Sequence, residues 1–190
     1  AGAAGLFCAG VAGQRGLKVL VIDHSDKIAE KIRISGGGRC NFTNRLLDAS
    51  APQKHFISQN PHFCRSALSR YTPQDFIELV RSHNIAFHEK TLGQLFCDGS
   101  ARQIVAMLMA ECDKSAAAGG HVDFVFDAPV GEVTHDGSDY HVTYNGVHAQ
   151  GGALVIATGG PSIPKMGATA FAYDLGRQFG LKIVEPRPAL

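Results

Sequence analysis

The chain contains the stretch Ser35-Gly36-Gly37-Gly38-Arg39-Cys40-Asn41. Three consecutive glycines cost conformational entropy on folding and pack no side chain, so they are expected where the backbone must pass close to another group. Backbone N–H groups in such a loop can bind an anion, and the Arg39 guanidinium offers planar donors to a phosphate or a carbonyl edge. The stretch therefore indicates a ligand-binding loop, and the alternative is a plain flexible turn.

The residues before this loop fit a dinucleotide-binding unit. Gly2 and Gly5 have the spacing of the last two glycines of G-x-G-x-x-G, which puts the first glycine and its strand before the first residue of the chain. We expect a helix of small and apolar residues over 3–15 and a strand buried on both faces over 17–22. Asp23 follows that strand, where such folds hold the ribose hydroxyls, and the alternative is an Asp that caps or turns the strand end.

A short helix is expected over 26–34, and it leads into the glycine loop. The loop is thus predicted to return to the same end of the sheet as Gly2 and Asp23. At that position it would meet a dinucleotide beyond its adenosine.

An antiparallel meander is predicted over about 130–150. In a dinucleotide domain this addition is typical of FAD-binding folds that resemble glutathione reductase, so FAD is the expected cofactor. In such folds the backbone near Val130 contacts the adenine, and the alternative is that Val130 only fills the core. The predicted strands are 130–135, 140–144 and 147–150, and the hairpin signals between them are Asp136-Gly137 and Asn145-Gly146.

A buried strand over 153–156 is expected to open into Ala157-Thr158-Gly159-Gly160. Paired glycines at the carboxyl end of a strand let a ligand approach closely, and the alternative is a simple turn. A helix is expected over 168–179, and 186–190 is interpreted as the start of a linker to a second domain. We therefore expect 1–185 to be a partial FAD-binding domain, and the chain to be a fragment without its first strand and its C-terminal part.

The middle of the chain carries local signals. Thr72-Pro73-Gln74-Asp75 has the pattern of a helix start, with a hydroxyl cap, a proline and an acid. A hairpin is expected between 84–89 and 94–97, and a helix capped by Ser100 follows. A further helix is expected over 61–71, with Phe63, Ala67 and Leu68 facing inward.

Several of these segments resemble the BaiN-type flavoproteins, also known as aminoacetone-oxidase-family FAD-binding proteins, over nearly the whole chain. The resemblance implies FAD bound in a Rossmann-like α/β fold, NAD(P)H as reductant, and a later domain that completes the flavin pocket. Some members of the family are linked to the reduction of unsaturated or oxo groups on steroid-like substrates. Where many related flavoproteins have Gly-Asp-Gly, this chain has Ala170-Phe171-Ala172, so no acid contact to the ribityl chain is assigned. The matching segments are 1–5, 19–23, 34–44, 93–96 and 157–160, continuing through Pro164 to Gly167.

Composition limits the classes of partner. The 190 residues carry a net charge of +1 and no Lys/Arg block, which argues against a nucleic-acid surface or a membrane patch. No apolar run approaches the roughly 18 residues of a membrane span. The five cysteines are widely spaced without a C-x-x-C pair, which argues against disulfides and a metal site and favours a reducing cytoplasm.

The sequence thus predicts a cytoplasmic FAD-dependent oxidoreductase that takes electrons from NAD(P)H and passes them to a small organic acceptor, without a nucleic-acid or membrane partner. Arg39 would stabilise a reduced flavin, and Cys40 is interpreted as a small packing residue. No catalytic acid or base and no oligomeric state is assigned. The alternatives are a non-catalytic FAD-binding module that senses redox state or acts as a scaffold, and a nucleotide-linked enzyme without flavin. A flavin-dependent RNA-modifying enzyme is disfavoured by the near-neutral charge.

Overall fold

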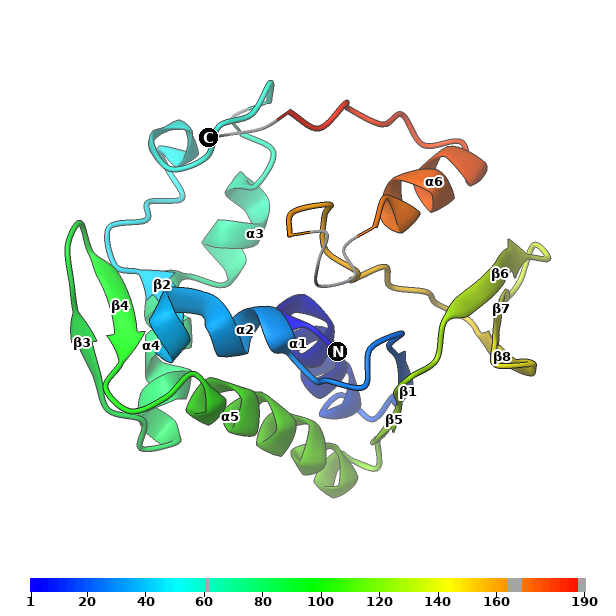
Figure 1. Cartoon of the computed structure of the whole chain (residues 1–190), viewed down its shortest axis with the longest axis horizontal. Helices are drawn as coiled ribbons and strands as arrows, with labels where there is room; N and C mark the ends of the chain where they lie inside the picture. The colour runs from blue at the N-terminus through cyan, green and yellow to red at the C-terminus, as the bar shows by residue number, and fades with distance from the viewer. Residues whose placement is uncertain (61, 164–168, 188–190) are drawn as a thin grey trace. The chain divides into compact units, whose positions relative to one another are not determined.

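The computed structural model describes residues 1–60, 62–163 and 169–187 (Figure 1). The chain forms two compact units. Residues 1–30 and 108–185 make up one of them, which we call the α/β unit. Residues 31–107, with the residues after 185, make up the other, which we call the inserted unit because it interrupts the first in sequence. In the described part of the chain no helix is long and apolar enough to cross a membrane.

The α/β unit begins with helix α1 (Ala3–Gly13) and strand β1 (Lys18–Ile22), close to the predicted bounds. β1 pairs in parallel with β5 (His121–Val125), so that Lys18 lies opposite His121. Parallel strands need a long crossover connection, and here it includes the whole inserted unit. Small residues let α1 lie close to the strands, as the sequence predicted.

The prediction that residues 17–22 are buried on both faces is wrong. Leu20 is 40% exposed, and Lys18 is exposed as well. Among the described residues β1 has one paired neighbour, β5, and full burial of a strand requires layers on both faces. A strand that is buried on both faces therefore needs an apolar sequence, but an apolar sequence alone does not bury the strand.

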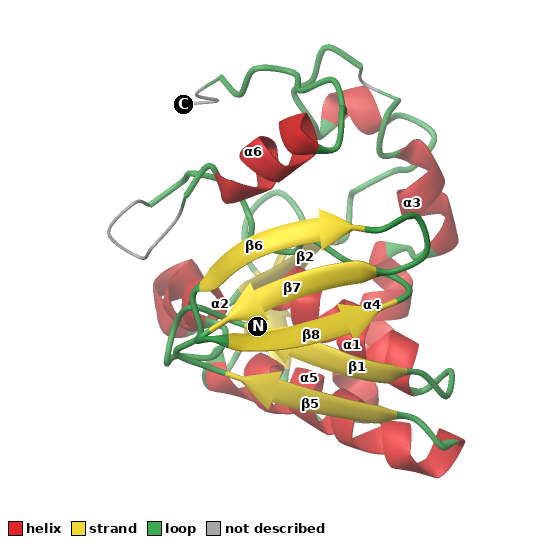
Figure 2. Ribbon diagram, turned by 90° about the vertical axis from the view of Figure 1, so that its right-hand side faces the viewer, coloured by secondary structure: helices red, strands yellow, loops and turns green. Residues whose placement is uncertain are grey.

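The meander lies in the α/β unit, and Figure 2 shows its three antiparallel strands in the order β6 (Val130–His135), β7 (Tyr140–Tyr144) and β8 (Val147–Gly151). Both predicted turns are present. Asn145 and Gly146 have φ of 47° and 76°, the left-handed values that a two-residue type I′ hairpin turn requires. Helix α6 (Phe171–Gln178) packs on this sheet, and its Leu175 shares a core with Val133 and Val142.

The predicted strand over 153–156 is absent. This segment has no strand conformation, and Val155 and Ile156 are 62% and 40% exposed. Leu154 alone packs against the core between the meander and α6. A strand needs a neighbour that accepts its backbone hydrogen bonds, and the apolar composition of 153–156 does not supply one.

The inserted unit contains an antiparallel sheet in the order β2 (Asn41–Asn44), β4 (Gln94–Cys97) and β3 (Phe87–Glu89). The predicted hairpin is confirmed, because β3 and β4 pair across the turn at Thr91-Leu92-Gly93. The capping pattern at 72–75 is confirmed as well, because the Thr72 Oγ1 accepts from the Asp75 N–H and the Asp75 carboxylate accepts from the Thr72 N–H. The elements are α2 (Glu30–Ile34), β2 (Asn41–Asn44), α3 (Arg65–Arg70), α4 (Pro73–Ser82), β3 (Phe87–Glu89), β4 (Gln94–Cys97) and α5 (Arg102–Asp113), which ends in the α/β unit.

Three predicted helices are shorter in the structure. α2 starts at Glu30 instead of residue 26, and α6 spans 171–178, while residue 168 lies outside the described residues. For the predicted helix over 61–71 the structure has only α3, which has no buried residue, and residue 61 is not described. Phe63 is 84% exposed and Ala67 is exposed, so the prediction that they face inward is wrong. Helical periodicity alone does not bury a face when no other element covers it.

Candidate functional site

The start of α1 and the end of β1 meet in the α/β unit. Gly2 directly precedes α1, and Asp23 directly follows β1. The Asp23 Oδ2 lies 2.5 Å from the backbone nitrogen of Ala1, and its Oδ1 accepts a hydrogen bond of 2.9 Å from the Ser25 N–H. A carboxylate therefore lies beside the N–H groups of the first turn of α1, which together with the helix dipole favour an anion.

Gly2 has open space around it. A Cβ at this position would meet no atom within 4 Å, and φ of −82° is a value that any residue adopts. Neither packing in the described chain nor backbone conformation therefore calls for glycine here. The space fits the close approach of a bound group such as a pyrophosphate.

Ala157 lies against the same helix turn. A Cβ at Gly5 would come within 3.5 Å of the Ala157 Cβ, which is ordinary van der Waals contact. The structure thus brings together four of the predicted site residues from three separate stretches of sequence: Gly2, Gly5, Asp23 and Ala157.

The Asp23 carboxyl is suited to accept hydrogen bonds. Partial burial acts to raise the pKa of Asp23 and the hydrogen bond from the Ser25 N–H acts to lower it, from an ordinary value far below neutral pH. The group is therefore an ionised acceptor near neutral pH. A ribose diol is the type of donor that such a carboxylate binds in dinucleotide folds.

The remaining predicted residues of the α/β unit lie near this group or in the core. Thr158 and Gly159 are exposed, and a Cβ at Gly160 would come within 3.5 Å of the Tyr173 Oη. Val130 starts β6 opposite Tyr144 and packs against the meander core. Its side chain has the packing role that the sequence left open, and a backbone contact to a cofactor at Val130 stays a prediction.

The glycine loop of the inserted unit is held by hydrogen bonds to its flanking elements. The Cys40 N–H donates to the Ser35 carbonyl at 3.0 Å, the Ala101 N–H to the Gly38 carbonyl at 2.7 Å, and the Cys97 N–H to the Arg39 carbonyl at 2.9 Å. Residues 35–38 form a tight turn in which three consecutive glycines, Gly36, Gly37 and Gly38, have positive φ. The loop has a defined conformation, and ligand binding by it stays a prediction.

The polar residues of this loop differ in exposure. Arg39 and Asn41 are exposed, whereas Cys40 is 5% exposed. Burial raises the pKa of the Cys40 thiol, so the thiol is protonated near neutral pH, and its burial fits the packing role. The Ser35 Oγ donates to the Ile32 carbonyl at 2.8 Å and thereby ties the loop to α2.

The glycine loop lies in the inserted unit, whereas Gly2, Gly5, Asp23 and Ala157 lie in the α/β unit. That the loop lies at the same end of the sheet as Gly2 and Asp23 therefore stays a prediction. In the described part of the chain, no three His, Cys, Asp or Glu side chains form a group that could hold a metal ion.

The chain is similar to known proteins over its whole length. The family model for the HI0933-like protein Rossmann domain matches residues 1–187. The chain is 51% identical over 190 residues to the ribosomal RNA dihydrouridine synthase of Escherichia coli (strain K12), and 46% identical over 194 aligned positions to that of Haemophilus influenzae. It is 23% identical over 174 residues to the 3-dehydro-bile acid delta(4,6)-reductase of Clostridium scindens.

The chain spans about half the length of the curated relatives that it matches, namely 45%, 46% and 40%. Among solved structures, the halogenase PltM in complex with phloroglucinol and FAD matches with a TM-score of 0.46 and 16% identity, over 97% of this chain and 36% of the halogenase chain.

The expected set of partners, a small molecule and no nucleic acid, is wrong. The relatives at 51% and 46% identity are named as enzymes that act on ribosomal RNA. The expectation rested on a net charge of +1 and on the lack of a Lys/Arg block, whereas phosphate contacts can also come from basic residues spread along a segment.

Proposed function

This chain belongs to the HI0933-like family of Rossmann domains, and from that premise we propose that the whole protein is a flavin-dependent oxidoreductase that reduces uridine in ribosomal RNA to dihydrouridine. The observation that supports this most strongly is the 51% identity with a ribosomal RNA dihydrouridine synthase over all 190 residues. Acting on ribosomal RNA, the protein would work in the cytoplasm.

FAD is the proposed cofactor, and the residues at the start of α1 fit it. The open space at Gly2 and the N–H groups of the first turn would take the pyrophosphate, and Asp23 would accept hydrogen bonds from the adenosine ribose. Ser35–Asn41 would run along the ribityl chain or the ring, and Ala157–Gly160 would close the pocket. In this proposal 1–185 forms the partial FAD-binding domain, and a linker starts at 186.

The reaction adds a hydride and a proton across the C5–C6 double bond of uracil. FAD, when bound, supplies the hydride chemistry, and we propose NAD(P)H as the source of the electrons, which becomes NAD(P)⁺. The proton comes from a general acid, and no residue of this chain is assigned to that role. The chain's own residues would bind and orient the cofactor.

The test uses the full-length protein and ribosomal RNA transcribed in vitro, which carries no modification. After incubation with FAD and NADPH or NADH, the RNA is digested to nucleosides and analysed by mass spectrometry. We expect dihydrouridine to form only when enzyme and reductant are both present. Tight FAD binding without any dihydrouridine would overturn the proposal and favour the non-catalytic FAD-binding module.

The role of Asp23 is tested separately in the same protein. Asp23→Ala removes the proposed ribose acceptor and should weaken FAD binding by about tenfold. The control is Asp123→Ala, which removes an exposed carboxylate on β5. Equal FAD affinities of both variants and the wild type, measured by flavin fluorescence, would remove Asp23 from the site.

A further inference from the structure

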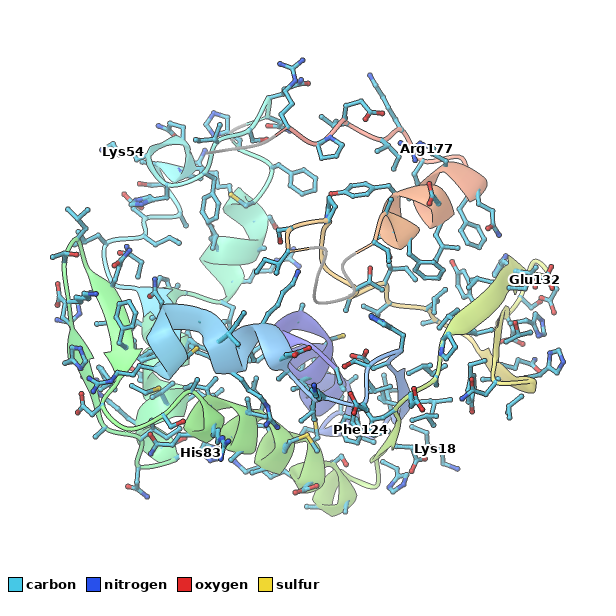
Figure 3. The ribbon with its side chains drawn as sticks, in the orientation of Figure 1. Lys18, Lys54, His83, Phe124, Glu132 and Arg177 are labelled. Atoms are coloured by element: carbon cyan, nitrogen blue, oxygen red, sulfur yellow. The ribbon has the colours of Figure 1, made fainter. Side chains whose placement is uncertain are left out.

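The segment between β2 and α4 in the inserted unit is both basic and exposed. Residues 45–71 contain four Lys or Arg residues, Arg45, Lys54, Arg65 and Arg70, and one acidic residue, Asp48. All four basic side chains are exposed. Arg45 is paired with Glu89 at 3.0 Å, so the positive charge of the segment is concentrated at 54–70. Figure 3 labels Lys54, at the end of the short 3-10 turn Pro52–Lys54.

Large apolar side chains of this segment are exposed as well. Ile57 and Phe63 are 91% and 84% exposed, and Phe56 is 39% exposed. Helix α3 in the same segment has no buried residue. A folded chain rarely leaves several large apolar side chains together in water unless another molecule or segment covers them.

Basic and aromatic residues lie next to one another at two places in this segment. Lys54-His55-Phe56 places two basic or titratable residues directly before an exposed aromatic ring. The same combination recurs after residue 61, where His62, Phe63 and Arg65 lie within four positions. Rings that stack on bases, with cations beside them for the phosphates, are the combination by which proteins bind single-stranded nucleic acid.

We propose that residues 54–60 and 62–70, which we call the RNA-contact segment, bind single-stranded or looped RNA, with Phe63 as a base-stacking residue and Lys54, Arg65 and Arg70 as phosphate contacts. The inference rests on the proposed function, and it names the part of the chain that holds the RNA. Charge complementarity favours RNA over an apolar protein partner, because three of the exposed side chains are permanent cations and no acidic residue lies in the segment.

The experiment measures binding of the full-length protein to ribosomal RNA transcribed in vitro, by filter binding over a series of salt concentrations. Phe63→Ala should weaken binding by about tenfold, through loss of stacking on a base. The triple variant Lys54→Ala, Arg65→Ala, Arg70→Ala should bind with a weaker salt dependence, because the negative slope of log affinity against log salt should become smaller in magnitude by about 2. The matched control is Leu92→Ala with Arg102→Ala, which removes an exposed apolar and an exposed basic side chain of the same unit outside the segment.

Two further substitutions separate stacking from packing. Phe63→Trp keeps an aromatic ring and should retain RNA binding, whereas Phe63→Leu keeps an apolar side chain and should lose it. FAD content and the rate of flavin reduction by NADPH should remain at the wild-type level in all variants. The opposite result would be that Phe63→Trp lowers the melting temperature, Phe63→Leu does not, and neither changes the affinity for RNA. It would mean that another part of the protein covers the segment, and it would overturn the inference.

Failure of this inference and failure of the proposed function give different results. If the wild-type protein forms dihydrouridine and all segment variants bind RNA as tightly as the control does, only the assignment of the segment is wrong. If the wild-type protein neither binds ribosomal RNA nor forms dihydrouridine, the proposed function is wrong.

Discussion

Gly36 and Gly37 are adjacent in the glycine loop and yet have different surroundings. Both have positive φ, of 57° and 65°, where a side chain is strained. A Cβ at Gly36 would lie 2.6 Å from the Phe96 ring, whereas a Cβ at Gly37 would meet no atom within 4 Å. Gly36 is thus required by the protein's own packing. Gly37 leaves the backbone accessible to another molecule.

This difference predicts unequal losses of stability. Gly37→Ala should lower the free energy of unfolding by about 1 kcal/mol, from backbone strain alone. Gly36→Ala should lower it by about 3 kcal/mol, because the added methyl group also displaces the Phe96 ring. Urea denaturation of the full-length protein without added cofactor measures both values. Equal losses would show that Phe96 gives way without cost.

The cysteines should differ in reactivity. Cys97 and Cys112 are 0% and 2% exposed, and burial raises the pKa of each thiol to about 11. Since the thiolate is the reactive form, raising the pKa lowers its fraction at pH 8, and both should react slowly with iodoacetamide. Cys8 and Cys64 are half-buried and should be alkylated first. Mass spectrometry of timed samples measures the order, and alkylation of Cys97 before Cys64 in the native protein would contradict it.

Among the elements, α4 shows how fully a local signal can specify a helix end. Thr72 and Asp75 exchange hydrogen bonds between side chain and backbone in both directions. Pro73 follows the cap, where its missing N–H has no cost. Ile77 and Val80 then bury the inner face of the helix.

Removal of the cap should destabilise the protein in a pH-dependent way. Thr72→Ala should cost about 1 kcal/mol near neutral pH. Hydrogen bonds from the Thr72 hydroxyl and N–H lower the pKa of Asp75, so this stabilisation is present above the ordinary pKa of Asp and is lost as the pH falls through the lowered value. The difference between variant and wild type in urea denaturation should therefore shrink in acid. Ser82→Ala, which removes a hydroxyl that donates to the Leu79 carbonyl in the same helix, is the control and should show no such pH dependence.

The elements that could be predicted from sequence are those whose signals are local. The turn at Asn145-Gly146 and the cap at Thr72 are encoded by adjacent residues, and both are present in the structure. The segments 153–156 and 61–71 were predicted from apolar content, and their conformation depends on whether another element covers them. Sequence alone does not contain that information, so the strand over 153–156 is absent and the helix over 61–71 is reduced to α3, which has no buried residue.

At the scale of the whole molecule, the sequence predicted the Gly2, Gly5 and Asp23 group because its spacing follows from one βαβ crossover. The contact of Ala157 with α1 could be expected only from the order of strands in such a fold. The division into two units could not be predicted, because it depends on contacts between residues distant in sequence. The RNA partner that we propose was not predicted, because the expectation rested on the net charge of the full chain and on the lack of a Lys/Arg block.

The two-unit organisation and the exposure of 54–70 predict where a protease cuts first. Among residues 45–60 and 62–71 only Pro52 is buried, so local opening there costs little free energy. Trypsin should cleave the native full-length protein after Lys54, Arg65 or Arg70 before it cleaves after Lys18 in β1. Ribosomal RNA should slow these cuts if the segment contacts RNA. First cleavage within β1 would contradict the expected order.

The pairing of β1 with β5 also has a consequence for synthesis of the protein. Lys18 pairs with His121 and Ile22 with Val125, while residues 31–107 form a unit of their own. During translation, the nascent chain therefore leaves the ribosome with the apolar residues of β1 lacking the partner that they have in the native fold. They remain a target for chaperones, and an aggregation hazard, until residue 125 has emerged from the exit tunnel.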